Sequence, residues 1–271
     1  MPNAEHHQKI RSIGEVPWDN QQIREAIPEF LKLYRQRPHA DNTGGMKSPH
    51  MFATWFMLRQ IKPGWVLESG VWKGQGTWLL EQSVPEASLV CIEPVPRHIE
   101  WRSEKATYLT EDFTQRRWEE VNKARALLFF DDHQNAFERL KAAYKLGFKH
   151  LIFEDNYPAS QGDCYSLKKA FMESGFKPKV SGLSGRLRQL VRPEEAIEPN
   201  KADAAFLQAV VKTYYEFPPV WKTAKTRWDD DWTDACYPTP EPLYDKALAP
   251  QLKVFVEEAQ SYTWICYVEL A

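Results

Sequence analysis

Short apolar segments alternate with amphipathic ones over residues 65–175, and this alternation limits the possible folds of the chain more than any other feature. The apolar segments have the length and the β-branched and aromatic content of strands. They occupy residues 65–68, 88–93, 107–110, 126–130 and 150–153. Helical patterns cover residues 77–82, 134–146 and 166–173. Because strands separated by helices form parallel sheets, we predict an α/β fold with a doubly wound, mainly parallel, Rossmann-like sheet.

The segments before and after this alternation have different residue patterns. Helical patterns over residues 19–35, with Asp19 as N-cap, and 48–61, with Ser48 as N-cap, predict an N-terminal helical extension over residues 1–62. Residues 63–271 then form the α/β domain. Within it, residues 178–250 are rich in proline and are interpreted as an insertion or lid. That insertion contains a helix candidate at 202–214, and the tail at 262–270 has the pattern of a strand that returns to the sheet.

Composition excludes several classes of protein. Lys and Arg number 35 and Asp and Glu 37, so the net charge is −2, without the basic footprint of a nucleic-acid-binding protein. Residues 1–15 are polar, unlike a secretory signal, and no apolar run reaches the length of about 18 residues that a membrane span needs. The cysteines form no CxxC pair; they are Cys91, Cys164, Cys236 and Cys266. We expect a cytoplasmic protein with reduced thiols and no nucleic-acid or membrane partner, and the sequence leaves a homo-oligomer open.

A glycine-containing loop joins the first strand of the alternation to the helix that follows it, between Val66 and Thr77. Ligands of open α/β sheets bind at the carboxyl ends of strands, where this loop lies. Its spacing is Gly-x-x-x-Gly-x-Gly, whereas the dinucleotide fingerprint is Gly-x-Gly-x-x-Gly. It also lacks the Lys-Ser/Thr ending of a P-loop. The loop therefore predicts a nucleoside cofactor other than a dinucleotide or a nucleoside triphosphate.

Acidic residues at two strand ends indicate which cofactor this is. A carboxylate at Glu68 repels a pyrophosphate but suits the ammonium and sulfonium groups of S-adenosylmethionine. Glu93, at the end of the next strand, suits the hydroxyls of a ribose. The cofactor-binding candidates are Glu68, Gly70, Gly74, Thr77, Glu93 and Asp112. An alternative is that the glycines serve only a tight turn and that Glu68 is a solvated strand end.

Further acids follow the strands at 126–130 and 150–153. Asp132 follows the first of them, and Asp155 and Asn156 follow the second. Adjacent parallel strands bring their carboxyl ends side by side, so we expect these three side chains to converge beside the cofactor. Carboxylate and amide oxygens suit Mg²⁺ or another divalent cation. The alternative is that these acids only cap the segments that follow them.

The motifs together resemble those of class I S-adenosylmethionine-dependent methyltransferases, of the catechol O-methyltransferase-like and macrolide-sugar (macrocin-type) O-methyltransferase families. The segment Val66–Thr77 resembles the cofactor loop of these families, and Cys91-Ile-Glu-Pro94 their ribose-binding strand end. The segments Phe130–His133 and Glu154–Asn156 resemble their two metal-bearing segments. The resemblance spans residues 65–157 and implies Mg²⁺ ligands at Asp132, Asp155 and Asn156.

The general base is where the sequence departs from this pattern. Catechol enzymes carry a catalytic lysine three residues after the first metal aspartate, and this chain has Asn135 there. His133 and Asp131 are our catalytic candidates, and His50 is a more distant one. His133 has two further interpretations, since it fits equally well as a residue that packs against the adenine or that caps the next helix.

These observations predict metal-dependent transfer of a methyl group from S-adenosylmethionine to a hydroxyl of a small molecule, such as a sugar or secondary metabolite. Two alternatives remain: a metal-dependent hydroxylase or hydrolase on the same fold, and a catalytically silent binding module. We expect the loop at 39–46 and the aromatic segment at 221–237 to border the acceptor site. The aromatic residues of that segment either stack on the acceptor or pack the lid onto the sheet; they are Trp221, Trp228, Trp232 and Tyr237.

Overall fold

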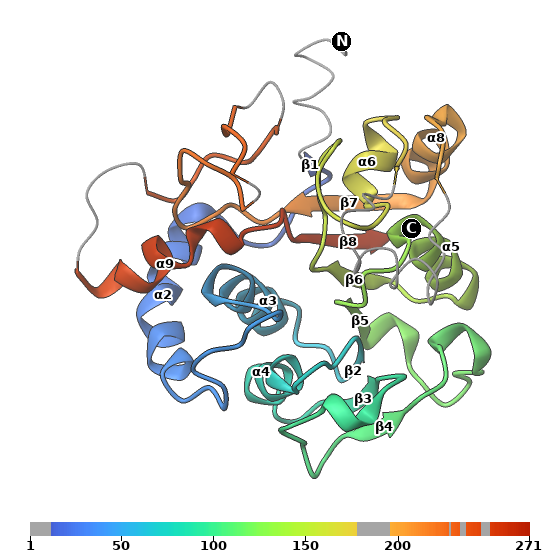
Figure 1. Ribbon diagram of the computed structural model, residues 1–271. Coiled ribbons are helices and arrows are strands. Elements are labelled where there is room, and N and C mark those ends of the chain that lie inside the picture. Colours follow the sequence, from blue (N-terminus) through green and yellow to red (C-terminus); the bar gives the residue numbers. More distant parts are fainter. Residues whose placement is uncertain (1–11, 178–195, 228, 234–236, 245–249) are drawn as a thin grey trace.

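A mixed sheet of eight strands forms the centre of the protein (Figure 1), whose computed structural model describes residues 12–177, 196–227, 229–233, 237–244 and 250–271. The strand order within this part of the chain is β1-β7-β8-β6-β5-β2-β3-β4. Strands β2 to β6 run parallel, whereas β8 runs antiparallel to β6 and β7 on its two sides. The predicted α/β class, with a doubly wound and mainly parallel sheet, is confirmed.

The strands that the apolar pattern predicted are all present, with ends that differ by one residue or none. Their bounds are β2 Trp65–Ser69, β3 Ser88–Ile92, β4 Thr107–Leu109, β5 Ala126–Phe130 and β6 His150–Phe153. Three further strands complete the sheet: β1 Ser12–Ile13, β7 Val211–Glu216 and β8 Cys266–Leu270. Strand β5 is buried at every position because helices cover both faces of the sheet, which explains its continuous apolar run.

Helices lie on both faces of the sheet (Figure 1). One face carries α2 Asn20–Tyr34, α3 Ser48–Ile61, α4 Gln75–Ser83 and α9 Lys253–Glu257. The other carries α5 Ala136–Leu146, α6 Leu167–Phe171 and α8 Lys201–Val210. Short 3-10 turns lie at Pro96–His98, Phe113–Gln115, Lys123–Arg125, Pro250–Leu252 and Ala259–Ser261. Each face has its own large cluster of buried apolar side chains, so the sheet separates two cores.

Helix α3 belongs to the first of these cores. Every residue from Ser48 to Leu58 is buried, because α3 packs on α2, α4 and the sheet. The predicted cap of α3 was wrong by one residue: Lys47 is the N-cap and Ser48 is the first helical residue. For α2 the prediction is confirmed, and Asp19 forms a capping box with Gln22.

The helix predicted at 202–214 was wrong at its C-terminal end. Helix α8 ends at Val210, and β7 begins at Val211 and pairs antiparallel with β8. Valine, threonine and tyrosine fit this strand, and its ladder with β8 satisfies the backbone groups that a longer helix would have satisfied. The segment interpreted as an insertion therefore contributes one strand to the sheet. Two residues of that segment singled out above, Trp228 and Cys236, lie outside the described residues.

The sheet reverses its strand order between β2 and β5. From β2 the chain proceeds to β3 and β4 on one side, and it returns to β5 and β6 on the other. Ligands of open α/β sheets bind outside the carboxyl ends of the strands at such a switch point. Gly70 and Asp131 are the residues that directly follow β2 and β5. Of the helices in the described ranges, none is long and apolar enough to cross a membrane.

Candidate active site

The loop after β2 and the turn after β5 are in direct contact at the switch point. The Asp131 backbone N–H donates to the Ser69 carbonyl oxygen at 2.9 Å. Gly70 has a φ of +95°, and a Cβ added there would lie 2.1 Å from the Asp131 carbonyl oxygen. A side chain at Gly70 would therefore force the two strand ends apart. This glycine is required by the packing of the sheet itself, whether or not a ligand also approaches it.

Glu93 holds the glycine loop from the next strand end. Its carboxylate accepts hydrogen bonds from the backbone N–H groups of Val71 at 3.3 Å, Trp72 at 3.1 Å and Val95 at 2.9 Å. Gly74 begins α4 with a φ of +95°, and a Cβ there would lie 2.0 Å from a backbone carbonyl oxygen. Contact of Glu93 with a ribose stays a prediction, and the carboxylate already lies beside the loop that would bind the nucleoside.

Glu68 and Thr77, two of the cofactor-binding candidates, contact each other beneath α4. The Thr77 hydroxyl donates to Oε2 of Glu68, and both side chains are buried. Oε1 of Glu68 has no hydrogen-bond partner within the part of the chain that the structure describes. Burial raises the pKa of Glu68 from 4.5 to about 7.

Arg139 of α5 joins two of the predicted site acids. Its guanidinium pairs with Asp132 at 2.8 Å and also with Asp112. Asp132 further accepts from the Ser69 hydroxyl at 2.7 Å and from the Gln134 N–H at 3.1 Å. Asp132, predicted as a metal ligand, and Asp112, predicted as a cofactor ligand, are thus both engaged by this arginine.

Both polar atoms of the Asn156 side-chain amide form hydrogen bonds within the protein. Its Oδ1 accepts the Lys168 backbone N–H at 2.9 Å, and its Nδ2 donates to the Tyr214 hydroxyl at 2.8 Å. That hydroxyl donates to Glu216, which also accepts from the Lys168 ammonium at 2.6 and 2.7 Å. The Asn156 amide is therefore part of a buried network between β6, α6 and β7. Its predicted role as a metal ligand stays untested, and this network gives the residue a structural role.

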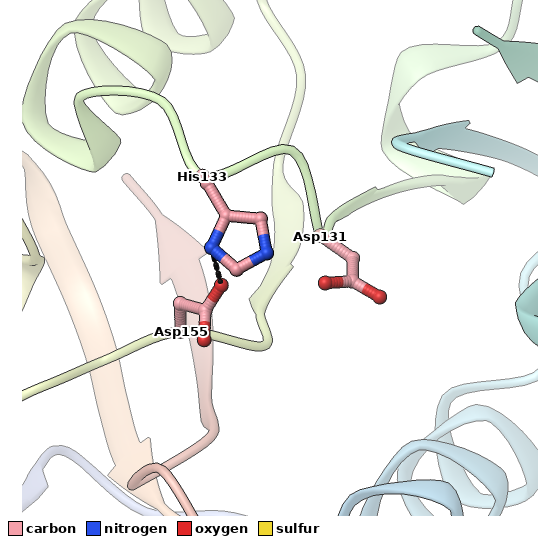
Figure 2. A group of neighbouring side chains, drawn as sticks. All are labelled: Asp131, His133 and Asp155. Atoms are coloured by element: carbon pink, nitrogen blue, oxygen red, sulfur yellow. Dashed lines mark ion pairs between the residues drawn. The ribbon is translucent and has the colours of Figure 1, made fainter. Parts of the chain in front are cut away.

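Asp131, His133 and Asp155 are the predicted residues that the structure does bring together. One potential ligand atom from each lies within 4.8 Å of the others (Figure 2). Asp155 lies on one side of the imidazole ring and Asp131 on the other (Figure 2). His133 Nδ1 lies 2.9 Å from Asp155 Oδ2 and 3.1 Å from Asp163 Oδ1. The two carboxylates, with the imidazole beside them, form an oxygen donor set that fits a divalent cation.

The charges of this cluster perturb one another. The negative charge of Asp155 holds the pKa of His133 well above its ordinary value. Burial would raise the pKa of Asp155, but His133 outweighs it, and the pKa lies below the ordinary value. Burial, with the charges of Glu154 and Asp155, raises the pKa of Asp131. Carboxylates that resist ionisation because of neighbouring acids would be relieved by a bound cation, so the electrostatics fit a metal as well as the geometry does.

Two residues near the cluster were not assigned to the cation site from the sequence. Glu154 follows β6 directly and is buried, and its Oε1 is bonded to Nδ1 of the buried His50 in α3. Glu154 belongs to the acidic segment Glu154–Asn156, which the sequence already indicated as a candidate metal-bearing segment. For His50, the sequence offered no sign of a contact with a residue so distant in the chain. Asn135, at the position expected for lysine, caps α5 by accepting the Glu138 N–H at 3.1 Å.

The N-terminal loop at 39–46 lies against the glycine loop, and its place at the border of the acceptor site stays a prediction. The Trp72 indole N–H donates to the Thr43 carbonyl at 3.3 Å, and Gln75 Oε1 accepts the His39 N–H at 3.2 Å. In the aromatic segment, Trp232 is only 9% exposed and packs on Trp264 with ring centroids 5.0 Å apart. Trp232 therefore packs the segment onto the protein rather than offering a free ring to an acceptor.

Comparison with known proteins gives structural relatives only. No family model and no curated protein matches the chain. An SAH-bound methyltransferase from Podospora anserina is 15% identical, with a TM-score of 0.36 over 52% of this chain and 72% of that one. The O-methyltransferase TomG from Streptomyces achromogenes, solved with SAM, is 15% identical, with a TM-score of 0.37 over 68% and 81%. A third structure, cmcI-D160 with Mg and SAM, is 21% identical, with a TM-score of 0.34 over 44% and 58%.

Proposed function

We propose that the protein transfers a methyl group from S-adenosylmethionine to a hydroxyl of a small molecule, with the help of a divalent cation. The observation that carries this proposal is the cluster of Asp131, His133 and Asp155 at the switch point of the sheet. The glycine loop contacts the backbone of Asp131, so the predicted cofactor loop and the cluster adjoin. The positive sulfonium of the cofactor and a metal ion both suit an acidic site.

Asp131 and Asp155 would hold the cation. When bound, a divalent cation would orient the acceptor oxygen and lower the pKa of its hydroxyl. The chain itself contributes the orientation of the two carboxylates: the backbone contact with Ser69 fixes the turn at Asp131, and His133 fixes Asp155. Mg²⁺ or Mn²⁺ is the cation that oxygen ligands favour.

With a cation bound beside Asp155, whose negative charge otherwise raises the pKa of His133, the neutral ring of His133 would accept the proton of the acceptor hydroxyl. Its Nδ1 faces two carboxylates, Asp155 and Asp163, which can only accept a hydrogen bond when ionised. Nδ1 is therefore the protonated nitrogen of the neutral ring, and Nε2 is the nitrogen that accepts a proton. A carboxylate that fixes the tautomer and orientation of a histidine in this way is a recurrent arrangement of general bases.

Calorimetry tests the cofactor and the metal together. S-adenosylmethionine should bind the wild-type protein, and Mn²⁺ should bind with a stoichiometry of about one. Turnover, followed as S-adenosylhomocysteine release with a panel of hydroxylated acceptors, should stop with EDTA and return with Mg²⁺. Absence of binding at millimolar cofactor would contradict the proposal. Cofactor binding without turnover on any acceptor would favour a silent binding module, and metal-dependent hydrolysis or hydroxylation would favour the other alternative.

The role of His133 has a separate test. His133→Ala should lower turnover by roughly 10²–10⁴-fold and leave the affinity for the cofactor nearly unchanged. A weaker affinity with an unchanged maximal rate would instead place His133 against the adenine. Glu86→Gln, which changes an exposed carboxylate between α4 and β3, serves as the control and should change neither quantity.

A further inference from the structure

His50 lies in α3, outside the strand ends that form the cluster, and it is 1% exposed. The Thr263 backbone N–H donates to its Nε2 at 2.7 Å. A backbone N–H can only donate, so Nε2 carries no proton. Nδ1 must then carry the proton of the neutral ring, and it donates to Oε1 of Glu154. Burial supports this neutral form, since it lowers the pKa of His50 to about 3.

Thr263, which precedes β8, holds the backbone of the segment that contains Asp155. Its hydroxyl donates to the Glu154 carbonyl oxygen at 3.0 Å, and its own carbonyl accepts the Asn156 N–H at 3.0 Å. The residues on both sides of Asp155 are therefore tied to the segment before β8. The histidine ring is held by Thr263 and in turn holds the Glu154 side chain, so the carboxylate direction is set by α3.

We infer that His50 is a positioning residue for the cation site: its Nδ1–H fixes the Glu154 carboxylate beside Asp155 and so sets the charge that the cation meets. The inference rests on the proposed function, because it assigns His50 to the cation site proposed there. His50 itself touches neither the cation nor the substrate. Mutation of a side chain that hydrogen-bonds a metal ligand commonly changes metal affinity by 10–100-fold, and His50 acts on Asp155 through such a side chain, Glu154.

Two substitutions separate the two hydrogen bonds of the ring. His50→Asn keeps a donor near the position of Nδ1 and loses the acceptor for Thr263, whereas His50→Gln keeps an acceptor near Nε2 and loses the donor to Glu154. Mn²⁺ is the probe, with its affinity measured by calorimetry and by the loss of the free-ion EPR signal. We expect His50→Gln to weaken Mn²⁺ binding by roughly 10–100-fold, and His50→Asn to stay within about threefold of wild type.

A double-mutant cycle tests whether the effect passes through Glu154. In the Glu154→Gln background, His50→Gln should change Mn²⁺ affinity by less than about threefold, because the carboxylate charge that His50 positions has been removed. The cycle does not use His50→Asn, so it also gives an answer if that variant proves unstable. Equal Mn²⁺ affinity of wild type and His50→Gln, or an equal loss in both backgrounds, would overturn the positioning role.

Failure of the proposed function would give a different result in the Mn²⁺ titrations. Wild-type protein that does not bind Mn²⁺ at millimolar concentration would remove the cation site, and the role of His50 with it. Wild-type protein that binds Mn²⁺ normally, with no effect of His50→Gln, would remove only the role of His50.

Discussion

Glu68→Gln should change how the stability of the protein depends on pH. The carboxyl is 1% exposed, and burial raises its pKa from 4.5 to about 7. Between these two values the folded state binds a proton that the unfolded state does not, so the free energy of unfolding falls as the pH rises. Raising the pKa of this carboxyl from 4.5 to about 7 corresponds to roughly 3 kcal/mol of free energy of unfolding, of which roughly 2–3 kcal/mol is lost between about pH 5 and pH 8.

The glutamine variant lacks this titration. Its side-chain oxygen can still accept the Thr77 hydroxyl, and any cost of an unpaired amide N–H applies equally at every pH. We therefore expect the variant to gain roughly 2–3 kcal/mol relative to wild type between about pH 5 and pH 8, whatever its absolute stability. Urea unfolding followed by circular dichroism at several pH values measures the difference.

The control for this experiment is Glu86→Gln, which removes one carboxylate charge from an exposed position next to the same helix. Its difference from wild type should stay within about 0.5 kcal/mol across the same pH range. Glu68→Gln and wild-type curves that ran parallel with pH would show that burial does not raise the pKa of this carboxyl, contrary to the prediction.

Other parts of the structure lead to three further predictions. Gly74→Ala should destabilise the protein by at least about 1–2 kcal/mol in thermal unfolding, because φ is +95° and the new Cβ would lie 2.0 Å from a backbone carbonyl oxygen. Lys168→Met should cost about 3–5 kcal/mol in urea unfolding, because it leaves the fully buried Glu216 without its cation; a loss under 1 kcal/mol would contradict this. Asp131→Asn should abolish Mn²⁺ binding, whereas Asp132→Asn should retain it, because Arg139 already neutralises Asp132; the reverse result would restore Asp132 as the metal ligand.

The parallel strands could be predicted from the sequence because each is defined by its own residues. Strand β5 is apolar at every position and is buried at every position. Strand β7 could not be predicted in the same way. The apolar pattern of α8 runs on without a break past Val210, and the change to a strand depends on pairing with β8, which lies far along the chain. Secondary structure set by a distant partner is beyond what local pattern can indicate.

The candidate site could likewise be predicted from the sequence only in part. The switch point and the acidic strand ends could be predicted, since parallel strands end together. The individual roles of Asp131 and Asp132 could not, because neighbouring residues of an extended chain point in opposite directions. Asp132 is turned to Arg139, and Asp131 to the side of Asp155. The packing of α5 decides whether Asp131 or Asp132 faces Arg139. The sequence around the two aspartates is compatible with both arrangements.

The distribution of charge in the site favours a cationic ligand over an anionic one. Asp132 is paired with Arg139, Asp155 with His133, and Glu154 accepts the Nδ1–H of the neutral His50. Asp131 has no hydrogen bond or ion pair of this kind among the described residues, and its pKa is raised by burial and by Glu154 and Asp155. A phosphate or pyrophosphate at the switch point would add to this negative charge, whereas a metal ion or a sulfonium would compensate it. The acids at this end of the sheet and the spacing of the glycine loop, which differs from the dinucleotide fingerprint, therefore favour the same class of ligand.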